Sequence, residues 1–306
     1  MKTKIVVGSR GSQLALIQAE SVAAKIREIN PRFEVSLSKI VTKGDRERHT
    51  RLDEVAGIGV FVKELEEALL GNSIDLAVHS LKDMPAQIPH GLCLLAVAER
   101  FDPRDVLVAK SRLDALAPGS RIGTGSLRRA VQLTQYRPDL KVCSIRGNID
   151  TRLRKVSYGE VDGVILAAAA IVRLGWEDKI SEYLPLERFL PAVGQGVLAI
   201  EARLGDEEIA RLISPINHLP TWRSVTAERA FLSALGGGCR APIAALGTVD
   251  GDILKLKGMV AEASGRKILH SSEEGSVKSP EEVGVWLAQK MLGMGASDFI
   301  AEVRAR

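Results

Sequence analysis

The sequence predicts an α/β protein with two lobes built on mainly parallel sheets and a small α+β domain at its C-terminal end. Strand and helix patterns alternate through the first hundred residues, and they alternate again from residue 105 onward. After Pro220 strands are grouped with strands and helices with helices, which is typical of an α+β domain. With 306 residues, the chain is about two average domains long and needs no disulfide bonds to bury a core.

The first lobe is predicted from alternating periods of two and of about 3.6 residues. Because parallel strands need crossover connections, this order favours a parallel sheet covered by helices. The predicted strands are residues 4–7, 33–40, 74–78 and 92–98, and the predicted helices are residues 13–29 and 61–70.

The second lobe repeats the alternation, and a later apolar run, residues 196–203, forms one more predicted strand. That strand could return to the first lobe, but the pattern alone leaves this open. The predicted strands of the second lobe are residues 105–109, 121–123, 140–145 and 163–166, with helices at 127–136 and 149–158.

The C-terminal domain begins with a predicted helix at residues 221–235 and a run of glycines. Three segments of strand character follow, at residues 243–249, 253–262 and 267–272, and two helices close the chain at 280–292 and 297–304.

Composition excludes several classes of protein. The net charge is +4, too balanced for a protein whose whole surface binds nucleic acid. Three scattered cysteines without a CxxC pair predict neither a disulfide scaffold nor a metal site. No export signal is visible, and the longest stretch without Asp, Glu, Lys or Arg, residues 84–98, is too short to cross a membrane. A cytoplasmic protein is expected.

Two successive strand-to-helix turns of the second lobe carry arginines. Ser126 is a predicted N-cap, and Arg128 and Arg129 follow it in the first helical turn, where the helix dipole disfavours positive charge. Arg146 and Arg152 flank the next helix start. Parallel strands end at one edge of a sheet, so both turns predict a shared site for an anion there. Surface arginines at solvated helix starts are the alternative.

The first lobe offers candidate residues after two of its strands. Lys82 and Asp83 follow a buried strand, where an acid could assist the loss of a leaving group or stabilise a cation. A surface ion pair is the commoner role for such a pair. Arg10 and Ser12, after the first strand, are possible anion contacts.

Cys239 is the cysteine with the strongest signal for reactivity. It follows three glycines and precedes Arg240, which could lower its pKa enough to give thiolate. Cys93 and Cys143 lie in apolar strand patterns and are predicted to be inert core residues.

Several motifs together resemble those of the hydroxymethylbilane synthase family, also called the porphobilinogen deaminase family. The resemblance covers essentially the whole chain, and motifs in the same order are more specific than any one of them. They are GSRGS (8–12), VHSLKD (78–83), GTGSLRR (123–129), RGNIDTR (146–152), PAVGQG (191–196), AERAF (227–231) and GGC (237–239).

The resemblance implies a chemistry. Cys239 would carry a dipyrromethane cofactor through a thioether, and four porphobilinogen molecules would condense head to tail with loss of ammonia. Hydrolysis would then release linear hydroxymethylbilane. Asp83 would be the catalytic residue, assisting the loss of the amino group and stabilising cationic pyrroles. Each pyrrole carries an acetate and a propionate, so the arginines gain carboxylate partners.

The resemblance also implies residue roles and an architecture. Cofactor-binding residues would be Lys82, Asp83, Thr124, Ser126, Arg128, Arg129, Arg146 and Arg152, and substrate-binding residues Arg10, Ser12, Arg173 and Gln195. Two periplasmic-binding-protein-like lobes with mixed, mainly parallel sheets are expected, formed by residues 1–99 with 196–217 and by residues 100–195, with a C-terminal α+β domain at 218–306. A monomer with no nucleic-acid or membrane partner is expected, as is a possible transient hand-over of product to the next pathway enzyme.

Two positions depart from the family pattern. Ile58 stands where many members have lysine, and Gly236 where glutamate is common. Ile58 cannot pair with a carboxylate, so one charge contact is in doubt.

The main alternative function is a non-catalytic two-lobe protein that binds a small polyanion, which would need neither Cys239 nor Asp83. Nucleic-acid binding is a second alternative, but 4% aromatic residues give little support for base stacking. Residues 121–155 hold nine Lys or Arg against Asp139 and Asp150, a local excess of +7 that we interpret as carboxylate anchors.

Overall fold

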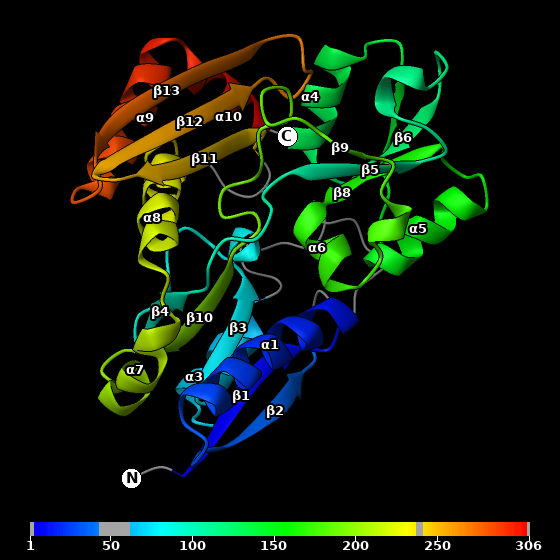
Figure 1. The fold of residues 1–306 in the computed structure, drawn as a ribbon. Coiled ribbons are helices and arrows are strands. Elements are labelled where there is room, and N and C mark those ends of the chain that lie inside the picture. Colours follow the sequence, from blue (N-terminus) through cyan, green and yellow to red (C-terminus); the bar gives the residue numbers. More distant parts are fainter. Residues whose placement is uncertain (1–2, 43–61, 237–240, 305–306) are drawn as a thin grey trace. The chain divides into compact units, whose positions relative to one another are not determined.

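The computed structural model describes residues 3–42, 62–236 and 241–304. Their contacts form two compact units, one of Met1–Arg100 with Val197–Trp222 and one of Phe101–Gly196 with Arg223–Arg306. The described residues form two five-stranded mixed sheets and one three-stranded antiparallel sheet, which confirm the predicted α/β class with its small C-terminal α+β part (Figure 1). The predicted boundaries of three separate domains stay a prediction.

The first unit holds a sheet of order β2-β1-β3-β10-β4. β1 pairs in parallel with β2 and β3, whereas β10 is antiparallel to both β3 and β4. The strand predicted from residues 196–203 therefore does return to the first sheet. The strands are β1 (Lys4–Arg10), β2 (Glu34–Ile40), β3 (Leu76–Ser80), β4 (Leu92–Val97) and β10 (Leu198–Arg203).

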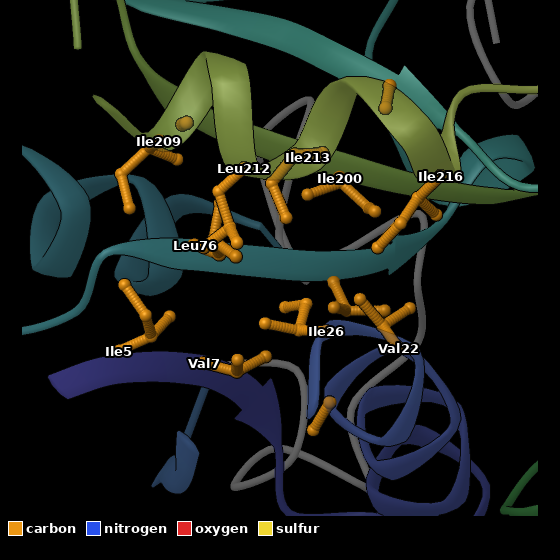
Figure 2. Packing of buried hydrophobic residues seen from close by; sticks show 14 of the residues in the cluster. Ile5, Val7, Val22, Ile26, Leu76, Ile200, Ile209, Leu212, Ile213 and Ile216 are labelled. Carbon is orange, nitrogen blue, oxygen red and sulfur yellow. The ribbon is translucent and has the colours of Figure 1, made fainter. Parts of the chain in front are cut away.

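Within the described residues, the helices that cover this sheet are α1 (Gln13–Ile29), α3 (Lys63–Leu70) and α7 (Glu207–Ile213). Side chains of β1, β3 and β10 meet those of α1 and α7 in one buried cluster, in which Ile5, Leu76 and Ile26 are labelled in Figure 2. Leu65 and Leu69 of α3 belong to a second cluster. Alternate residues of the strands therefore supply two apolar cores.

The second unit begins with a sheet of order β7-β6-β8-β5-β9. β6 is parallel to β7 and β8, and β5 is antiparallel to β8 and β9, so the fourth position again holds an antiparallel strand. The elements are β5 (Asp105–Ala109), β6 (Arg121–Gly123), β7 (Lys141–Cys143), β8 (Gly163–Ala167), β9 (Glu182–Tyr183), α4 (Leu127–Tyr136), α5 (Ile149–Ser157) and α6 (Ala168–Arg173).

The C-terminal sheet has the antiparallel order β11-β12-β13. One set of its side chains packs with α8, α9 and α10, and another set, which includes Ala244 and Met259, packs against Val131 of α4 and Leu190. The elements are β11 (Ile243–Asp250), β12 (Ile253–Ala261), β13 (Ile268–Ser276), α8 (Leu219–Ala234), α9 (Pro280–Gly293) and α10 (Ala296–Arg304).

Glu228 of α8 joins the parts of the second unit. This fully buried carboxylate accepts hydrogen bonds from the backbone N–H of Gly194 at 2.7 Å and of Gly247 at 2.8 Å. It thereby fixes the segment before β10 and strand β11 to the helix that precedes Cys239.

The element predictions fail mainly at short elements. Helices α6 and α7 and strand β9 were not predicted, because helices of six and seven residues and a strand of two residues give too little periodicity. The predicted strand at 74–78 begins and ends two residues later, and Phe61, the predicted first residue of α3, lies outside the described residues. None of the described helices is long and apolar enough to span a membrane.

The side chains of Glu66 in α3, His79 in β3 and Glu201 in β10 form a buried polar cluster in the first unit. Nε2 of His79 lies 2.9 Å from Oε2 of Glu201, whose side chain is completely buried. One carboxylate oxygen of Glu66 and one of Glu201 are buried without a hydrogen-bond partner. Burial raises the pKa of Glu66, the Glu201 carboxylate raises it further, and His79 opposes the rise.

We predict that Glu66→Gln makes the stability of the protein less dependent on pH. A carboxyl whose pKa is higher in the folded state stabilises the fold most below its unfolded pKa, near 4.5, and this contribution is lost as pH rises through the folded pKa. Urea unfolding at about pH 5 and at about pH 8 measures the free energy of unfolding of both chains. The difference, variant minus parent, should be larger at about pH 8 than at about pH 5. The matched control is Glu67→Gln, at the exposed next residue of α3. An equal difference at both pH values would contradict the prediction.

Candidate functional site

The first arginine-bearing turn of the second unit is built as a capped helix start. Ser126 is the N-cap of α4, and its side chain accepts a hydrogen bond from the N–H of Arg129, as predicted. Thr124, 3% exposed, accepts a hydrogen bond from the N–H of Ser126 through Oγ1 at 3.1 Å. Both hydroxyl groups therefore order the turn.

The second arginine-bearing turn lies beside the first, because β7 is the parallel neighbour of β6. Thr124 donates its N–H to the carbonyl oxygen of Cys143 at 2.9 Å. A Cβ on Gly125 would lie 2.9 Å from the carbonyl oxygen of Ile145, so the close approach requires glycine. The prediction that both turns share one sheet edge is confirmed.

Local contacts fix the start of α5. Gly147 has a φ of 101°, a conformation that glycine adopts easily, and its carbonyl oxygen accepts a hydrogen bond from Nε of Arg152 at 2.9 Å. Asn148 is the N-cap, but its side chain makes no capping hydrogen bond. Arg146 and Arg152 are both partly exposed at this edge.

Arg128 and Arg129 are buried, 4% and 6% exposed, and they meet a carboxylate of the chain itself. Oδ2 of Asp105 accepts from Nη1 of Arg128 at 2.8 Å, and Oδ1 accepts from Nε and Nη2 of Arg129 at 3.1 and 2.8 Å. The sequence indicates an anion at this helix start, and in the structure Asp105 occupies that role.

The charge state of Asp105 follows from these contacts. Complete burial raises the pKa of this carboxyl, but the two guanidinium groups outweigh that effect and hold the pKa well below its ordinary value. The carboxylate therefore stays charged, and with the two guanidinium groups it forms a cluster of net charge +1.

Gln195 and Arg173 lie in the same unit as the arginine pair. Gln195 is 1% exposed and donates through Nε2 to Oδ1 of Asp105 at 2.9 Å and to the carbonyl oxygen of Pro103 at 2.7 Å. Nη2 of Arg173 donates to the carbonyl oxygen of Gly196 at 3.3 Å, and no acidic side chain of the described residues forms an ion pair with it. Burial without a counter-charge lowers the pKa of Arg173.

The predicted residues of the first unit gather at the carboxyl edge of its parallel strands. Arg10 ends β1, and Lys82 and Asp83 form a 3-10 turn directly after the neighbouring strand β3. Ser12 is the N-cap of α1, and its side chain accepts from the N–H of Ala15. The side chain of Asp83 is exposed, and that of Lys82 is partly buried.

Buried contacts on the turn and the strand before it hold Asp83 in place. Leu81, 2% exposed, donates its N–H to the carbonyl oxygen of Val197 at 3.0 Å. Ser80 exchanges hydrogen bonds with the side-chain amide of Gln18 in α1, at 3.0 and 3.2 Å. Asp83 is thus an exposed acid on a fixed turn.

The local excess of positive charge needs correction. Six of the nine basic residues between 121 and 155 form ion pairs with acidic side chains. Three of the five acidic partners lie outside that stretch, namely Asp105, Asp162 and Glu160. The interpretation of the whole excess as ligand anchors was therefore too broad.

Two of the three cysteines, Cys93 and Cys143, lie in the part of the chain that the structure describes. Cys93 is partly buried, and both its burial and the charge of Glu201 raise the pKa of its thiol, which disfavours thiolate. Cys143 is also partly exposed rather than fully buried, against expectation. Cys239 and Ile58 lie outside the described residues. Gly236 is described and has a φ of 61°, where a glutamate would be strained.

Asp105 and Glu228 are the residues that the site prediction missed. Asp105 directly precedes an apolar run, so its signal is that of an ordinary strand start. In the sequence, the hint at a buried acid was the placement of Arg128 and Arg129 in the first turn of a helix, where the helix dipole disfavours positive charge. Within the described ranges, no group of three or more His, Cys, Asp or Glu side chains is arranged to hold a metal ion.

Comparisons with known proteins agree along the chain. Residues 5–211 match the family model "Porphobilinogen deaminase, dipyromethane cofactor binding domain", and residues 222–293 match "Porphobilinogen deaminase, C-terminal domain". Porphobilinogen deaminase of Syntrophus aciditrophicus is 46% identical over 94% of this chain and 95% of its own. That of Bacillus subtilis is 49% identical over 99% of this chain and 98% of its own.

Among solved structures, the methionine binding protein MetQ matches with a TM-score of 0.44 and 14% identity, over 74% of this chain and 93% of its own. The two family models together span both contact units, and the curated relatives match nearly end to end. The chain is an enzyme and belongs to the porphobilinogen deaminase family.

Proposed function

We propose that the chain is a transferase, a hydroxymethylbilane synthase of porphyrin and heme biosynthesis. It condenses four porphobilinogen molecules head to tail, loses one ammonia with each, and releases linear hydroxymethylbilane by hydrolysis. The observation that carries the proposal is the 46% identity to a porphobilinogen deaminase over 94% of the chain. The arginine-rich sheet edge supports it, since the substrate carries two carboxylates.

We assign the binding of these carboxylates to groups at the two sheet edges. Arginine pairs with a carboxylate through two parallel hydrogen bonds, and hydroxyl groups add neutral donors. Arg173 supports this assignment, because it is half-buried and its charge has no acid partner within the described parts of the chain. The proposed set is Arg10, Ser12, Lys82, Thr124, Ser126, Arg128, Arg129, Arg146, Arg152, Arg173 and Gln195.

Asp83 is the proposed catalytic residue. Loss of ammonia breaks a carbon–nitrogen bond and leaves positive charge on the pyrrole ring. The Asp83 carboxylate accepts a hydrogen bond from the leaving ammonium group and stabilises the cation that remains. Its exposed position on a turn fixed by Leu81 fits this role, because a substrate can reach the carboxylate while the backbone stays in place.

Cys239 is the proposed attachment point of the dipyrromethane cofactor, through a thioether. When bound, this group supplies the free pyrrole carbon to which the first substrate unit is joined. The donor set of the second unit fits it, since arginines and hydroxyl groups gathered at one sheet edge suit a ligand with four carboxylates. Glu228 holds the helix that leads to Cys239.

A non-catalytic polyanion-binding protein is the weaker alternative, because nothing in the site favours it over the enzyme. We further propose that the enzyme is a cytoplasmic monomer that does not bind nucleic acid or a membrane. A transient hand-over of the product to the next enzyme of the pathway completes the proposal.

We predict that the intact purified chain carries a covalent adduct of two pyrrole units, and that peptide mass spectrometry finds it on Cys239. Cys239→Ser should be folded and free of the adduct, since a hydroxyl is a much weaker nucleophile than a thiolate. Cys93→Ser and Cys143→Ser are the matched controls and should retain it. An active chain without any adduct, or an adduct on Cys239→Ser, would refute the attachment.

We predict that Asp83→Asn keeps the fold and the adduct but lowers kcat for porphobilinogen by about a hundredfold or more, the range expected for losing acid–base assistance. Steady-state kinetics with circular dichroism and intact mass measure the three properties. Asp252→Asn, in the exposed turn between β11 and β12, is the control and should leave kcat unchanged. A near-normal kcat in Asp83→Asn would assign the proton chemistry to another residue.

A further inference from the structure

The buried contacts of Asp105 point to a residue role beyond the sites proposed above. We propose that Asp105 is a positioning residue for carboxylate binding: it holds Arg128 and Arg129 in the orientation in which they meet the ligand. Asp105 need not touch the ligand itself. The inference rests on the proposed function, because it takes the ligand carboxylates to be those of pyrroles.

The first argument is electrostatic. Arg128 and Arg129 lie side by side with side chains only 5% and 8% exposed, so without a shared anion they would repel each other in a poorly solvated place. Burial and the charge of Arg129 lower the pKa of Arg128, whereas Asp105 raises it. With Asp105 present, the cluster keeps one net positive charge, and a further carboxylate would neutralise it.

The second argument is geometric. Both guanidinium groups also donate hydrogen bonds to backbone carbonyl oxygens. The carbonyl oxygen of Leu190 accepts from Nη1 of Arg128 at 2.7 Å, and that of Ile165 accepts from Nη1 of Arg129 at 3.2 Å. Gln132 fixes Leu190 in turn, donating to its carbonyl oxygen at 3.2 Å and accepting from its N–H at 2.7 Å. The guanidinium groups are therefore held in one orientation around Asp105.

The backbone of Asp105 is equally constrained. Asp105 opens β5 and stands opposite Ala167, the last residue of β8, so sheet pairing puts its carboxylate at the edge where α4 begins. Gln195 joins Oδ1 of Asp105 to the carbonyl oxygen of Pro103. A group on a paired strand orients its neighbours more accurately than one on a loop.

Arg128 shows where a ligand could bind. Its hydrogen bonds to protein groups run through Nη1, and its Nε and Nη2 make none with any part of the chain that the structure describes. Donors of the pair therefore remain after Asp105 is bound. A carboxylate that reaches them completes the charge balance of the cluster.

The simpler alternative is that Asp105 only stabilises the fold as a counter-ion. In that case a variant examined well below its unfolding temperature should load the cofactor and bind substrate normally. A positioning role predicts loss of both in folded protein. The fraction of chains that carry the two-pyrrole adduct and the KM for porphobilinogen therefore separate the two roles.

The test compares Asp105→Asn with Asp162→Asn. Asp162 is a matched control, because it pairs with Arg121 through its side chain and accepts the N–H of the same residue at the far end of β6. Each variant is purified, checked by circular dichroism, weighed intact, and assayed well below its unfolding temperature. We expect Asp105→Asn to carry the adduct in about a tenth of its chains or fewer, and the loaded fraction to have a KM raised about tenfold, as for other lost orienting partners.

Asp162→Asn should load fully and keep its KM within about twofold, which also shows that the proposed function holds. Normal loading and KM in folded Asp105→Asn would overturn the positioning role while leaving the function intact. If Asp105→Asn does not fold, Asp105→Glu replaces it, because the charge is kept but displaced by one methylene. A folded Asp105→Glu with parental loading and KM overturns the proposal, and reduced loading supports it. A parent chain without activity or adduct refutes the proposed function instead.

Discussion

The buried pairing of Asp105 with Arg128 and Arg129 is the interaction on which the second unit depends. Removing one partner of such a cluster leaves an uncompensated buried charge, which costs about 3–5 kcal/mol. The three side chains therefore depend on one another. Through Gln195 and Leu190 the same cluster fixes the segments around Pro103 and Gln195. The side chains of Arg128 and Arg129 are thus held in one arrangement in the folded chain.

A common topological rule explains where the functional groups lie. In each five-stranded sheet the fourth strand is antiparallel to the third, so it begins at the edge where the parallel strands end. In the second unit that first residue is Asp105. In the first unit the corresponding strand begins at Leu198, next to Val197, whose carbonyl oxygen accepts the N–H of Leu81 on the Asp83 turn. The start of an antiparallel strand therefore supports the proposed chemistry in both units.

The sequence predicted what depends on local physics. The bounds of α1, α4, β5 and β6, the cap at Ser126 and the shared edge of the arginine turns follow from periodicity, capping and parallel pairing. It could not reveal that Asp105, more than twenty residues before its arginines, is their partner, because a single acid before an apolar run is common to many strand starts. It also could not separate arginines that form ion pairs within the fold from those that we propose to bind a ligand, since ion pairs depend on long-range contacts.

The most direct test of this account is a titration of Asp105 itself, in a chain labelled with ¹³C at aspartate carboxyl carbons. If two guanidinium groups hold this carboxylate, its resonance should stay at the ionised position from about pH 7 to about pH 4, because its pKa lies well below the ordinary value of 3.8. A resonance that shifts over this range as an ordinary aspartate does would show that Asp105 does not hold the arginine pair.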